Sequence, residues 1–519
     1  MLFLSRLLRR GLFIIPLLLL AMMAGTIPFQ LPTAHAASTL TVTTTADLST
    51  CTTTLSLRCA INQANKDGSG DTIAFNIPHT DPGCAGSVCT ISITDALNPL
   101  PMLTANTTTI NGYTQPGARP NTNPLSSGDN AILTMRLDGG SAGNVEGFLV
   151  SGNGDTIKGF SITDFSNGFF TSGTSTGLTV QGNFIGLMPN GSTQAGNGNG
   201  LTNNASGTIM IGGISPANSN VISGNFSIQA SLGTADTLQG NIIGLNAAGN
   251  APVFNLLAGD IPTDGILAGG HDLIGGTASG AGNVIGGNAS GIRLTGSPTI
   301  QGNLIGTDVT GKVAIGNEEG ITFIGNSVPA RGVVVGGLVP AARNIISGNF
   351  NFGIDMGGQG NVVEGNYIGT DITGEVALPN GGQNGSTPDI NAGIILSANF
   401  TTNSTNNIIG GTTSAARNII SGNAFSGIRI AGQTGRGSTG STENNLVEGN
   451  WIGLDATGTR ALGNGTNGVF IGTAQGFGGQ ILNNGVTGNV IAHNGQSGIL
   501  IGSAATDTVV HSPISRNST

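Results

Sequence analysis

Two short phrases recur along this chain with the same period, and this recurrence restricts the fold more than any other feature. The first phrase reads VQGNFIGLMPNG from residue 180 and returns in variant form from residues 238, 300, 363 and 447. The second reads IGGISPANSNVISGN from residue 211 and returns from residues 274, 335 and 409. Its successive starts differ by 63 (274 − 211), 61 (335 − 274) and 74 (409 − 335) residues. A shared period of about 62 residues is typical of a repeat protein.

The repeats consist of short β-strands. Each phrase contains short runs of β-branched and other apolar residues bounded by Gly and Asn, a composition that favours strand over helix. We expect three coils of about 20 residues in each period, stacked as a parallel β-helix over residues 90–519. About 20 such coils, at about 4.8 Å each, would form a rod on the order of 90–100 Å long.

The Gly and Asn residues have structural explanations in such coils. Gly and Asn tolerate the left-handed backbone of corners, and inward Asn side chains of successive coils can form hydrogen-bonded ladders. The aspartates of the first phrase then become corner residues, because Asp308, Asp371 and Asp455 correspond to Met188 and Asn246 in other copies. Three coils would separate Asp308 from Asp371 by about 14 Å, whereas paired glycosidase carboxylates stand about 5–9.5 Å apart.

Composition excludes several other classes of protein. The chain has 519 residues, of which 89 are glycine, 38% are hydrophobic and only 8% are charged. Glycine without a G-X-Y period excludes collagen, and abundant branched aliphatic residues with little charge exclude a disordered chain. Only Lys66, Lys158 and Lys312 are lysines, so the chain lacks the basic stripe that a nucleic-acid partner would require.

Residues 1–36 have the pattern of a signal peptide. Arg6, Arg9 and Arg10 precede the apolar run GLFIIPLLLLAMMAG, and AHA at 34–36 is a small-residue cleavage site. A retained membrane anchor is the alternative, which Pro16 within the run disfavours. Removal of the segment takes the formal charge from −9 to −12 (−9 − 3), and no later run reaches the roughly 20 apolar residues of a membrane span. We therefore expect an acidic protein that is secreted or displayed at the cell surface.

The four cysteines, Cys51, Cys59, Cys84 and Cys89, lie within 39 residues. An even number in an exported chain predicts disulfides, and four cysteines permit three pairings. We favour Cys51–Cys59 and Cys84–Cys89, because the second pair flanks a short turn that contains Gly86. A zinc site is the alternative, but the spacing does not match the usual pairs in both halves, so no metal is expected.

The stretch LSLRCAINQANKDGSGDTIAFNI (55–77) resembles the N-terminal motif of bacterial right-handed parallel β-helix proteins named for the run CSLREA. Cys59 stands where that run has Glu. The stretch TINGYTQPG (109–117) and the repeat phrases are also similar to this family. The resemblance implies a right-handed β-helix and an exported or surface-associated protein, and it implies no activity.

Residues 37–89 would form an N-terminal cap region. Within them, Leu57, Ala60, Ile61 and Ala64 lie on one face of a predicted short helix, with Ser56 as its N-cap. A helix across the open end of the solenoid would protect its core from solvent and its strands from edge-to-edge association.

Residues 258–276, AGDIPTDGILAGGHDLIGG, interrupt the repeat and supply four catalytic candidates: Asp260, Asp264, His271 and Asp272. Clustered aspartates with a histidine are the residue types that polygalacturonases use. The alternative is a set of turn residues on a solvated loop. Some of these acids could also bind calcium, but the chain has neither an EF-hand loop nor a GGxGxD motif, so no cofactor is expected.

One further row of candidate residues comes from equivalent positions of the repeats. Arg293, Asp355 and Arg429 follow the second phrase at matching places, and we interpret them as a solvated strand face on widely separated coils rather than as the base of a lyase.

Another row contains Phe184, Ile242, Leu304, Tyr367 and Trp451, each following the GN of the first phrase. Phe184, Tyr367 and Trp451 are candidate ligand-binding residues, because aromatic faces can stack on sugar rings. Ordinary packing is the alternative, since Ile and Leu occupy the same position.

We expect an exported β-helix rod that serves as a surface or matrix binding or structural protein, with an extracellular polysaccharide or cell-surface component as its partner. The alternative is a polysaccharide lyase, hydrolase or epimerase. A lyase acting on polyuronate would need cations to neutralise its substrate, and a chain of charge −12 with three lysines is poorly suited to that. A compact cluster of carboxylates on one face of adjacent coils would favour an enzyme.

Overall fold

The computed structural model describes residues 37–519 except 51–53, 69, 94–97, 141–144, 254–262, 324–329, 383–390, 399–402, 434–439, 474–478, 503–504, 507, 516 and 518–519. The predicted signal peptide, residues 1–36, lies outside the described residues. Among the residues that are described, no helix is long and apolar enough to cross a bilayer.

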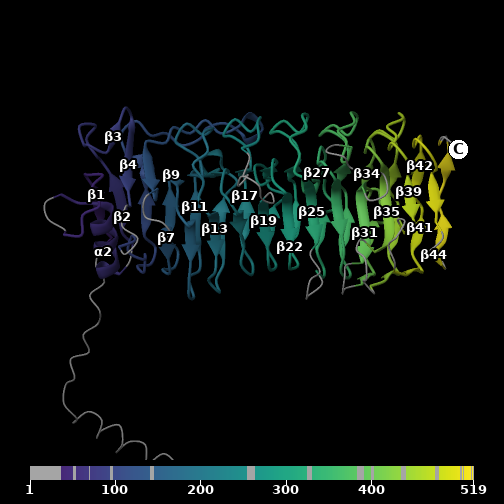
Figure 1. Ribbon diagram of the computed structural model, residues 1–519, viewed down its shortest axis with the longest axis horizontal. Helices are drawn as coiled ribbons and strands as arrows, with labels where there is room; N and C mark the ends of the chain where they lie inside the picture. Colours follow the sequence, from purple (N-terminus) through teal and green to yellow (C-terminus); the bar gives the residue numbers. More distant parts are fainter. Residues whose placement is uncertain are drawn as a thin grey trace, which may run out of the picture. The chain divides into compact units, whose positions relative to one another are not determined.

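Residues 37–519 wind into a right-handed parallel β-helix, as predicted (Figure 1). Each regular coil adds one strand to sheet 1, one to sheet 2 and one to sheet 3, in that order along the chain. The strands of neighbouring coils pair in parallel, and the hairpin of β3 and β4 is the one antiparallel pair between named strands of the described chain.

Sheet 1 contains β1 (Thr39–Val42), β2 (Thr72–Phe75), β5 (Thr109–Asn111), β8 (Thr156–Lys158), β11 (Leu178–Gln181), β14 (Ile209–Gly212), β17 (Thr237–Gln239), β20 (Leu273–Gly275), β23 (Thr299–Gln301), β26 (Val334–Gly336), β29 (Val362–Glu364), β33 (Ile408–Gly410), β37 (Leu446–Glu448), β41 (Gly485–Thr487) and β45 (Val509–His511).

Sheet 2 contains β3 (Cys84–Ala85), β4 (Val88–Ser92), β6 (Met135–Asp138), β9 (Phe160–Thr163), β12 (Phe184–Ile185), β15 (Val221–Ile222), β18 (Ile242–Ile243), β21 (Val284–Ile285), β24 (Leu304–Ile305), β27 (Ile345–Ile346), β30 (Tyr367–Ile368), β34 (Ile419–Ile420), β38 (Trp451–Ile452), β42 (Val490–Ala492) and β46 (Ile514–Ser515).

Sheet 3 contains β7 (Glu146–Val150), β10 (Asn167–Thr171), β13 (Asn199–Asn203), β16 (Ile228–Ser231), β19 (Asp264–Ala268), β22 (Ser290–Leu294), β25 (Glu319–Phe323), β28 (Phe352–Met356), β31 (Ala392–Ala398), β35 (Ser426–Gln433), β39 (Val469–Ile471) and β43 (Ile499–Ile501). A small fourth sheet contains β32 (Ser404–Thr405), β36 (Thr442–Glu443), β40 (Ile481–Leu482) and β44 (Ala505–Thr506). Short 3-10 turns are η1 (Gly112–Thr114), η2 (Leu125–Ser127), η3 (Pro216–Asn218) and η4 (Pro340–Ala342).

Stacked aliphatic side chains fill the interior of the coils. In sheet 2, for example, Ile305, Ile346 and Ile368 are register partners in successive coils, and all three are fully buried. Because every coil repeats this arrangement, one continuous hydrophobic core extends from Val42 to Ile491. The apolar pairs of the repeat phrases are these inward-facing residues and their neighbours.

The predicted asparagine ladders are present at the corners. Between sheets 1 and 2, the Asn303 amide donates to Asn344 Oδ1 at 3.0 Å, and the Asn344 amide donates to Asn366 Oδ1 at 2.9 Å. A second ladder connects sheets 2 and 3, where the Asn349 amide donates to Asn380 Oδ1 at 2.9 Å. Gly369 precedes this ladder with φ +91°, and a Cβ there would collide with Asn423 Oδ1.

The prediction of three coils in each period is wrong: each period contains two. Asn303, Asn344 and Asn366 occupy the same corner of three consecutive coils, although Asn344 belongs to the second phrase and the other two belong to the first. These two coils therefore contain 41 (344 − 303) and 22 (366 − 344) residues. After residue 90, the described chain has 13 strands in sheet 1 (15 − 2, without β1 and β2) rather than the expected 20 or so, because the long coils carry loops outside the sheets.

The aspartates of the first phrase are turn residues, as predicted, but the distance argument changes. Asp371 Oδ1 accepts hydrogen bonds from the Thr373 hydroxyl at 2.6 Å and from the Val376 N–H at 3.3 Å. Asn246 accepts the same type of bond from the Ala251 N–H at 3.3 Å. Asp308 and Asp371 lie two coils apart, hence about 10 Å rather than 14 Å. Their bonding, and not their separation, identifies them as corners.

Helix α2 (Leu57–Asp67) confirms the predicted cap helix. The Ser56 side chain accepts from the Cys59 N–H, Gly68 ends the helix, and Leu57, Ala60 and Ile61 are buried in the core. In Figure 1 the helix lies at the purple end of the coils, beside β1 and β2.

A buried arginine, which the sequence did not predict, fixes this helix in place. Arg58 forms two hydrogen bonds with the Asp47 carboxylate, of 2.8 and 2.6 Å, and donates to the carbonyls of Asn98 and Pro99. The planar guanidinium therefore connects the helix to segments on both sides of it.

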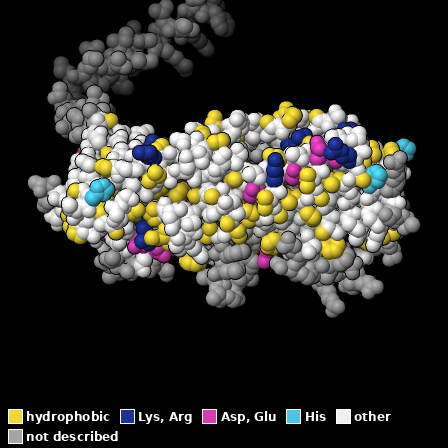
Figure 2. All heavy atoms as spheres, turned by 90° about the horizontal axis from the view of Figure 1, so that it is seen from above, with side chains coloured by type: hydrophobic (Ala, Val, Ile, Leu, Met, Phe, Trp, Pro, Cys, Tyr) yellow, Lys and Arg dark blue, Asp and Glu magenta, His cyan; other side chains and the backbone are white. Residues whose placement is uncertain are grey.

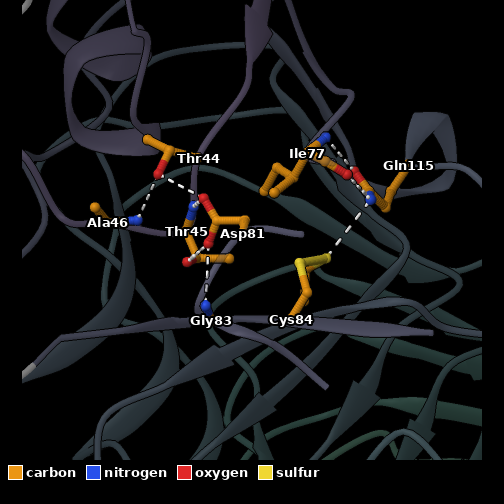
Figure 3. The surroundings of a disulfide bond; sticks show 9 residues. Thr44, Thr45, Ala46, Ile77, Asp81, Gly83, Cys84 and Gln115 are labelled. Atoms are coloured by element: carbon orange, nitrogen blue, oxygen red, sulfur yellow. Dashed lines mark hydrogen bonds between the residues drawn. A yellow bond between two sulfur atoms is a disulfide. The ribbon is translucent and has the colours of Figure 1, made fainter. Parts of the chain in front are cut away.

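The predicted Cys84–Cys89 disulfide is present and joins the two strands of the β3–β4 hairpin. Cys59 is also disulfide-bonded, and Cys51 lies outside the described residues. Asp81 lies beside the hairpin and accepts bonds from Thr44, Thr45 and the Gly83 N–H (Figure 3). Burial would raise the pKa of Asp81, but these hydrogen bonds hold it below its ordinary value.

Candidate functional site

The structure does not bring the three described catalytic candidates together. Asp260 lies outside the described residues. Asp264 begins β19 in sheet 3, whereas Asp272 precedes β20 in sheet 1, and His271 is exposed in the turn between them. In the described part of the chain, no group of three or more His, Cys, Asp or Glu side chains could hold a metal ion.

Asp272 is a corner residue of the coil. It is fully buried, and its carboxylate accepts the N–H of Asp236 at 2.8 Å and the N–H of Gly270 at 3.3 Å. Burial raises the pKa of Asp272 to about 6, with a smaller contribution from the charge of Asp236. These contacts fix the path of the backbone from sheet 3 to sheet 1.

A cluster of charges lies instead on the outer face of sheet 3. Arg293, Thr322, Asp355, Ile395 and Arg429 are register partners on consecutive strands, from β22 to β35. The three charged residues therefore lie in one row on every second coil, about 10 Å apart. They are much closer together than the widely separated coils expected from the sequence.

A second row of polar side chains runs beside the first. The Arg293 guanidinium contacts the Asp264 carboxylate at 3.1 Å. Glu319 is the register partner of Ser290 and accepts bonds from the Ser290 hydroxyl at 3.2 Å and the Thr322 hydroxyl at 2.8 Å. We call Asp264, Arg293, Glu319, Asp355 and Arg429 the charged face.

Asp355 has an unusual electrostatic environment. Burial and, to a smaller extent, the negative charge of Glu319 raise the pKa of Asp355 to about 7, and a hydrogen bond of 3.2 Å from the Ser397 hydroxyl opposes both effects. This carboxyl therefore titrates closer to neutral pH than an ordinary aspartate. A carboxyl in this state can donate or accept a proton.

Arg429 is the most buried member of the charged face. Its side chain is 4% exposed, and its guanidinium carbon lies 5.4 Å from the centre of the Phe470 ring. Arg293 is accessible by comparison, with 42% of its side chain exposed. With three carboxyl groups and two guanidinium groups, the charged face has no excess of positive charge.

The two rows of the charged face could have been predicted from the sequence by aligning the strands of sheet 3. Most strands of sheet 3 carry Gly at their second position, as in DGILA at 264, SGIRL at 290, EGITF at 319 and FGIDM at 352. Alignment on that Gly places Asp264 and Glu319 in one row, and Arg293 and Asp355 in the other. Glu319 was missed because its strand follows the first phrase, whereas the predicted row came from strands that follow the second phrase.

The aromatic row does not present free ring faces. Phe184 is 2% exposed and belongs to a second hydrophobic cluster outside sheet 2. The guanidinium carbon of Arg343 lies 4.1 Å from the Tyr367 ring centre, and that of Arg417 lies 4.2 Å from the Trp451 ring. Packing and cation–π contacts account for these residues.

No protein-family model and no curated protein matches this chain. Among solved structures, it is similar to the A-module of the Azotobacter vinelandii mannuronan C-5 epimerase AlgE6 (12% identity over 88% of this chain and 94% of that chain, TM-score 0.40). It is also similar to the Dettilon tailspike protein (15%, 88% and 67%, TM-score 0.43) and to the periplasmic alginate epimerase AlgG (12%, 79% and 76%, TM-score 0.34). At these values the similarity assigns no activity to this chain.

Proposed function

We propose that this protein is exported and binds a neutral extracellular polysaccharide along the charged face of sheet 3. The observation that supports this proposal is the gathering of Asp264, Arg293, Glu319 and Asp355 in two adjacent rows of one sheet. From β19 to β28 these four residues cross four strands in sheet order, or about 14 Å. An extended sugar chain could follow such rows.

Charge favours a neutral ligand over an acidic one. Carboxylates accept hydrogen bonds from sugar hydroxyls, and the guanidinium and the Ser290 and Thr322 hydroxyls can donate to sugar oxygens. The carboxyl groups outnumber the guanidinium groups, and Arg293 is already paired with Asp264. A polyuronate would meet repulsion at this face and from the chain as a whole, with its charge of −12 after removal of three arginines.

The test is retention of residues 37–519 by neutral and acidic polysaccharides in affinity electrophoresis. We expect slower migration in at least one neutral polysaccharide, and weaker retention for Glu319→Gln and Arg293→Gln. Glu364→Gln is the matched control, because Glu364 is a half-buried glutamate of sheet 1, away from the charged face. Equal retention of all three variants would contradict the assignment of the face.

Export is supported by the pattern of residues 1–36 and by the sequence resemblance of residues 55–77 to the CSLREA-type motif. We expect the protein recovered from the medium or the cell surface to begin at Ala37, which intact mass spectrometry would measure. Recovery of the chain from the cytoplasm with residues 1–36 attached would contradict export.

A second candidate function is hydrolysis of the bound glycan. The observation that favours it is the neighbouring pair of Asp355, whose pKa is raised to about 7, and Glu319, whose charge contributes to that shift. A pair of carboxyls can divide the roles of general acid and general base. Asp355 would donate the proton to the glycosidic oxygen, and Glu319 would activate water or attack the sugar.

New reducing ends report this reaction. If the pair is catalytic, Asp355→Asn removes cleavage while retention of the polysaccharide persists, and cleavage by the parent declines as pH rises above about 7. The sign follows from the protonated acid being the active form. Retention without new reducing ends in the parent would reject hydrolysis and leave the binding proposal intact.

A further inference from the structure

A loop of this chain packs along the outside of sheet 2. Residues 118–132, which we call the arm, leave the coils after β5 and return before β6. Arg119 and Ile132 pair at its base through two backbone hydrogen bonds of 2.9 and 2.8 Å. In Figure 1 a blue segment runs along the top of the coils from above β9 to above β17.

The arm contacts coils that are distant from its own. Leu125 and Ala131 pack on the second hydrophobic cluster, which includes Phe184 and Ile242. The Asp129 N–H donates to the Ala247 carbonyl at 2.7 Å. Leu125, which begins the 3-10 turn η2, and a backbone hydrogen bond from Asp129 therefore hold the arm against the outer loops of sheet 2.

Carbonyl groups equivalent to that of Ala247 recur in the loops further along the β-helix. Ala247, Val309 and Ile372 occupy the same position of three successive first-phrase loops, and each donates its N–H to a Gly carbonyl of the preceding loop at 2.8–3.1 Å. The carbonyl of Ala247 accepts from the arm. Within the residues that the structure describes, the carbonyls of Val309 and Ile372 accept no hydrogen bond.

A cavity of about 490 Å³ begins where the arm ends. Its lining includes Leu125 of the arm and, from the outer loops and sheet 2, Ile214, Gly280, Leu304, Val309 and Ile372. Ile214 is 53% exposed and Ile372 is 44% exposed, so the arm leaves apolar surface uncovered there. Every lining side chain is uncharged. Figure 2 looks onto this face, where hydrophobic and uncharged polar side chains predominate and charges gather toward one end.

We propose that this cavity binds an extended, uncharged segment of a partner polypeptide that continues the path of the arm. The segment would place an aliphatic side chain against Leu304 and Val309 and donate backbone N–H groups to the carbonyls of Val309 and Ile372. The arm supports a peptide as the occupant, because it already makes the equivalent apolar contact and the equivalent bond to Ala247.

The probe is a fluorescent peptide with the sequence of residues 121–128, NTNPLSSG, which has no charged side chain, titrated into residues 37–519 and followed by anisotropy. We expect saturable binding that Ser279→Trp weakens at least tenfold, because Ser279 lines the cavity and is exposed. Ser206→Trp is the control, since Ser206 is an exposed turn serine before β14, away from the cavity. Hydrogen exchange of the complex should protect residues 279–283 and 309–312.

Three outcomes would overturn the proposal. Equal binding by the parent and Ser279→Trp would show that the peptide binds elsewhere. Altered exchange at residues 245–249 without protection at 309–312 would show that the peptide only replaces the arm. Self-association of the parent that Ser279→Trp abolishes, with no binding of the peptide, would show that a second copy covers this face.

Discussion

The corner before sheet 1 holds aspartate in some coils and asparagine in others, and the two side chains differ there in hydrogen bonding and in charge. In the N-terminal half, the corner before sheet 1 holds Asp155, which accepts the Thr108 N–H at 2.8 Å. In the C-terminal half the same corner holds asparagine, as at Asn407, whose side chain accepts from the Asn361 N–H and donates to Asn445 Oδ1. Asp155 Oδ2 is buried without a hydrogen-bond partner among the described residues. Burial raises the pKa of Asp155 to about 7.

Asp155→Asn should therefore stabilise the protein at high pH. The folded state raises the carboxyl pKa above its ordinary value, so the folded state binds more protons between about pH 4 and 7, and stability falls across that window as pH rises. In Asp155→Asn the side chain does not titrate, so this fall in stability with rising pH is absent. We expect a gain on the order of 1–4 kcal/mol at pH 8 that shrinks toward pH 4, measured by urea unfolding. A gain independent of pH would contradict the explanation, and Asn407→Asp should show the opposite trend.

Asp371 should behave as a turn residue rather than as an acid. Asparagine can accept the same backbone bonds, as Asn246 does in an equivalent loop. We expect Asp371→Asn to change the free energy of unfolding by less than about 0.5 kcal/mol, and Asp371→Ala to cost about 1–2 kcal/mol. Thermal unfolding of the two variants would measure this difference. Equal losses in both would mean that the negative charge is required.

At the scale of the element, the corner ladders connect strands that are only two or three residues long. The Asn303 side chain donates to the Ile274 carbonyl at 2.9 Å and to Asn344, and it accepts from Asn283. A buried amide of this kind is satisfied only while both neighbouring coils are in register. The ladders therefore maintain a register that two-residue strands would hold weakly.

Asn303→Ala should cost about 2–4 kcal/mol, because it leaves buried polar groups of two neighbouring coils without partners. Urea unfolding followed by circular dichroism would measure the loss. Asn250→Ala is the control, since Asn250 is exposed and bonds only within its loop in the described chain. A loss no larger than that of the control would show that the ladder contributes little.

At the scale of the whole molecule, the strands of each coil pair only with those of neighbouring coils, so the stability of distant coils is expected to differ. Asp155→Asn should slow amide exchange at pH 8 in β5, β8 and β11, and leave β37 and β41 unchanged. Mass spectrometry of exchanged fragments would measure the effect. Uniform protection of all coils would mean that residues 37–519 unfold as one cooperative unit.

The side-chain contacts of the charged face and of the aromatic row depend on the tertiary structure. Glycine alignment could have placed Glu319 and Asp264 in one row, but the contact of Asp264 with Arg293 depends on coils of unequal length arriving in register. The arginines over Tyr367 and Trp451 come from neighbouring coils. Spacing within a single phrase does not indicate these contacts, so the aromatic row looked available for ligand from the sequence.

The sequence by itself determined the β-helix, the corner asparagines, the turn aspartates, the cap helix and the Cys84–Cys89 bond, because each depends on local conformation or on a residue type that recurs. Only the tertiary structure decided how many coils fill a period and which side chains meet on sheet 3. The physical reason is that the inward aliphatic pair and the ladder asparagine fix where a coil closes, while the loops between them vary in length at little cost. Two phrases with different sequences therefore occupy the same corner, and charges far apart in the chain lie side by side.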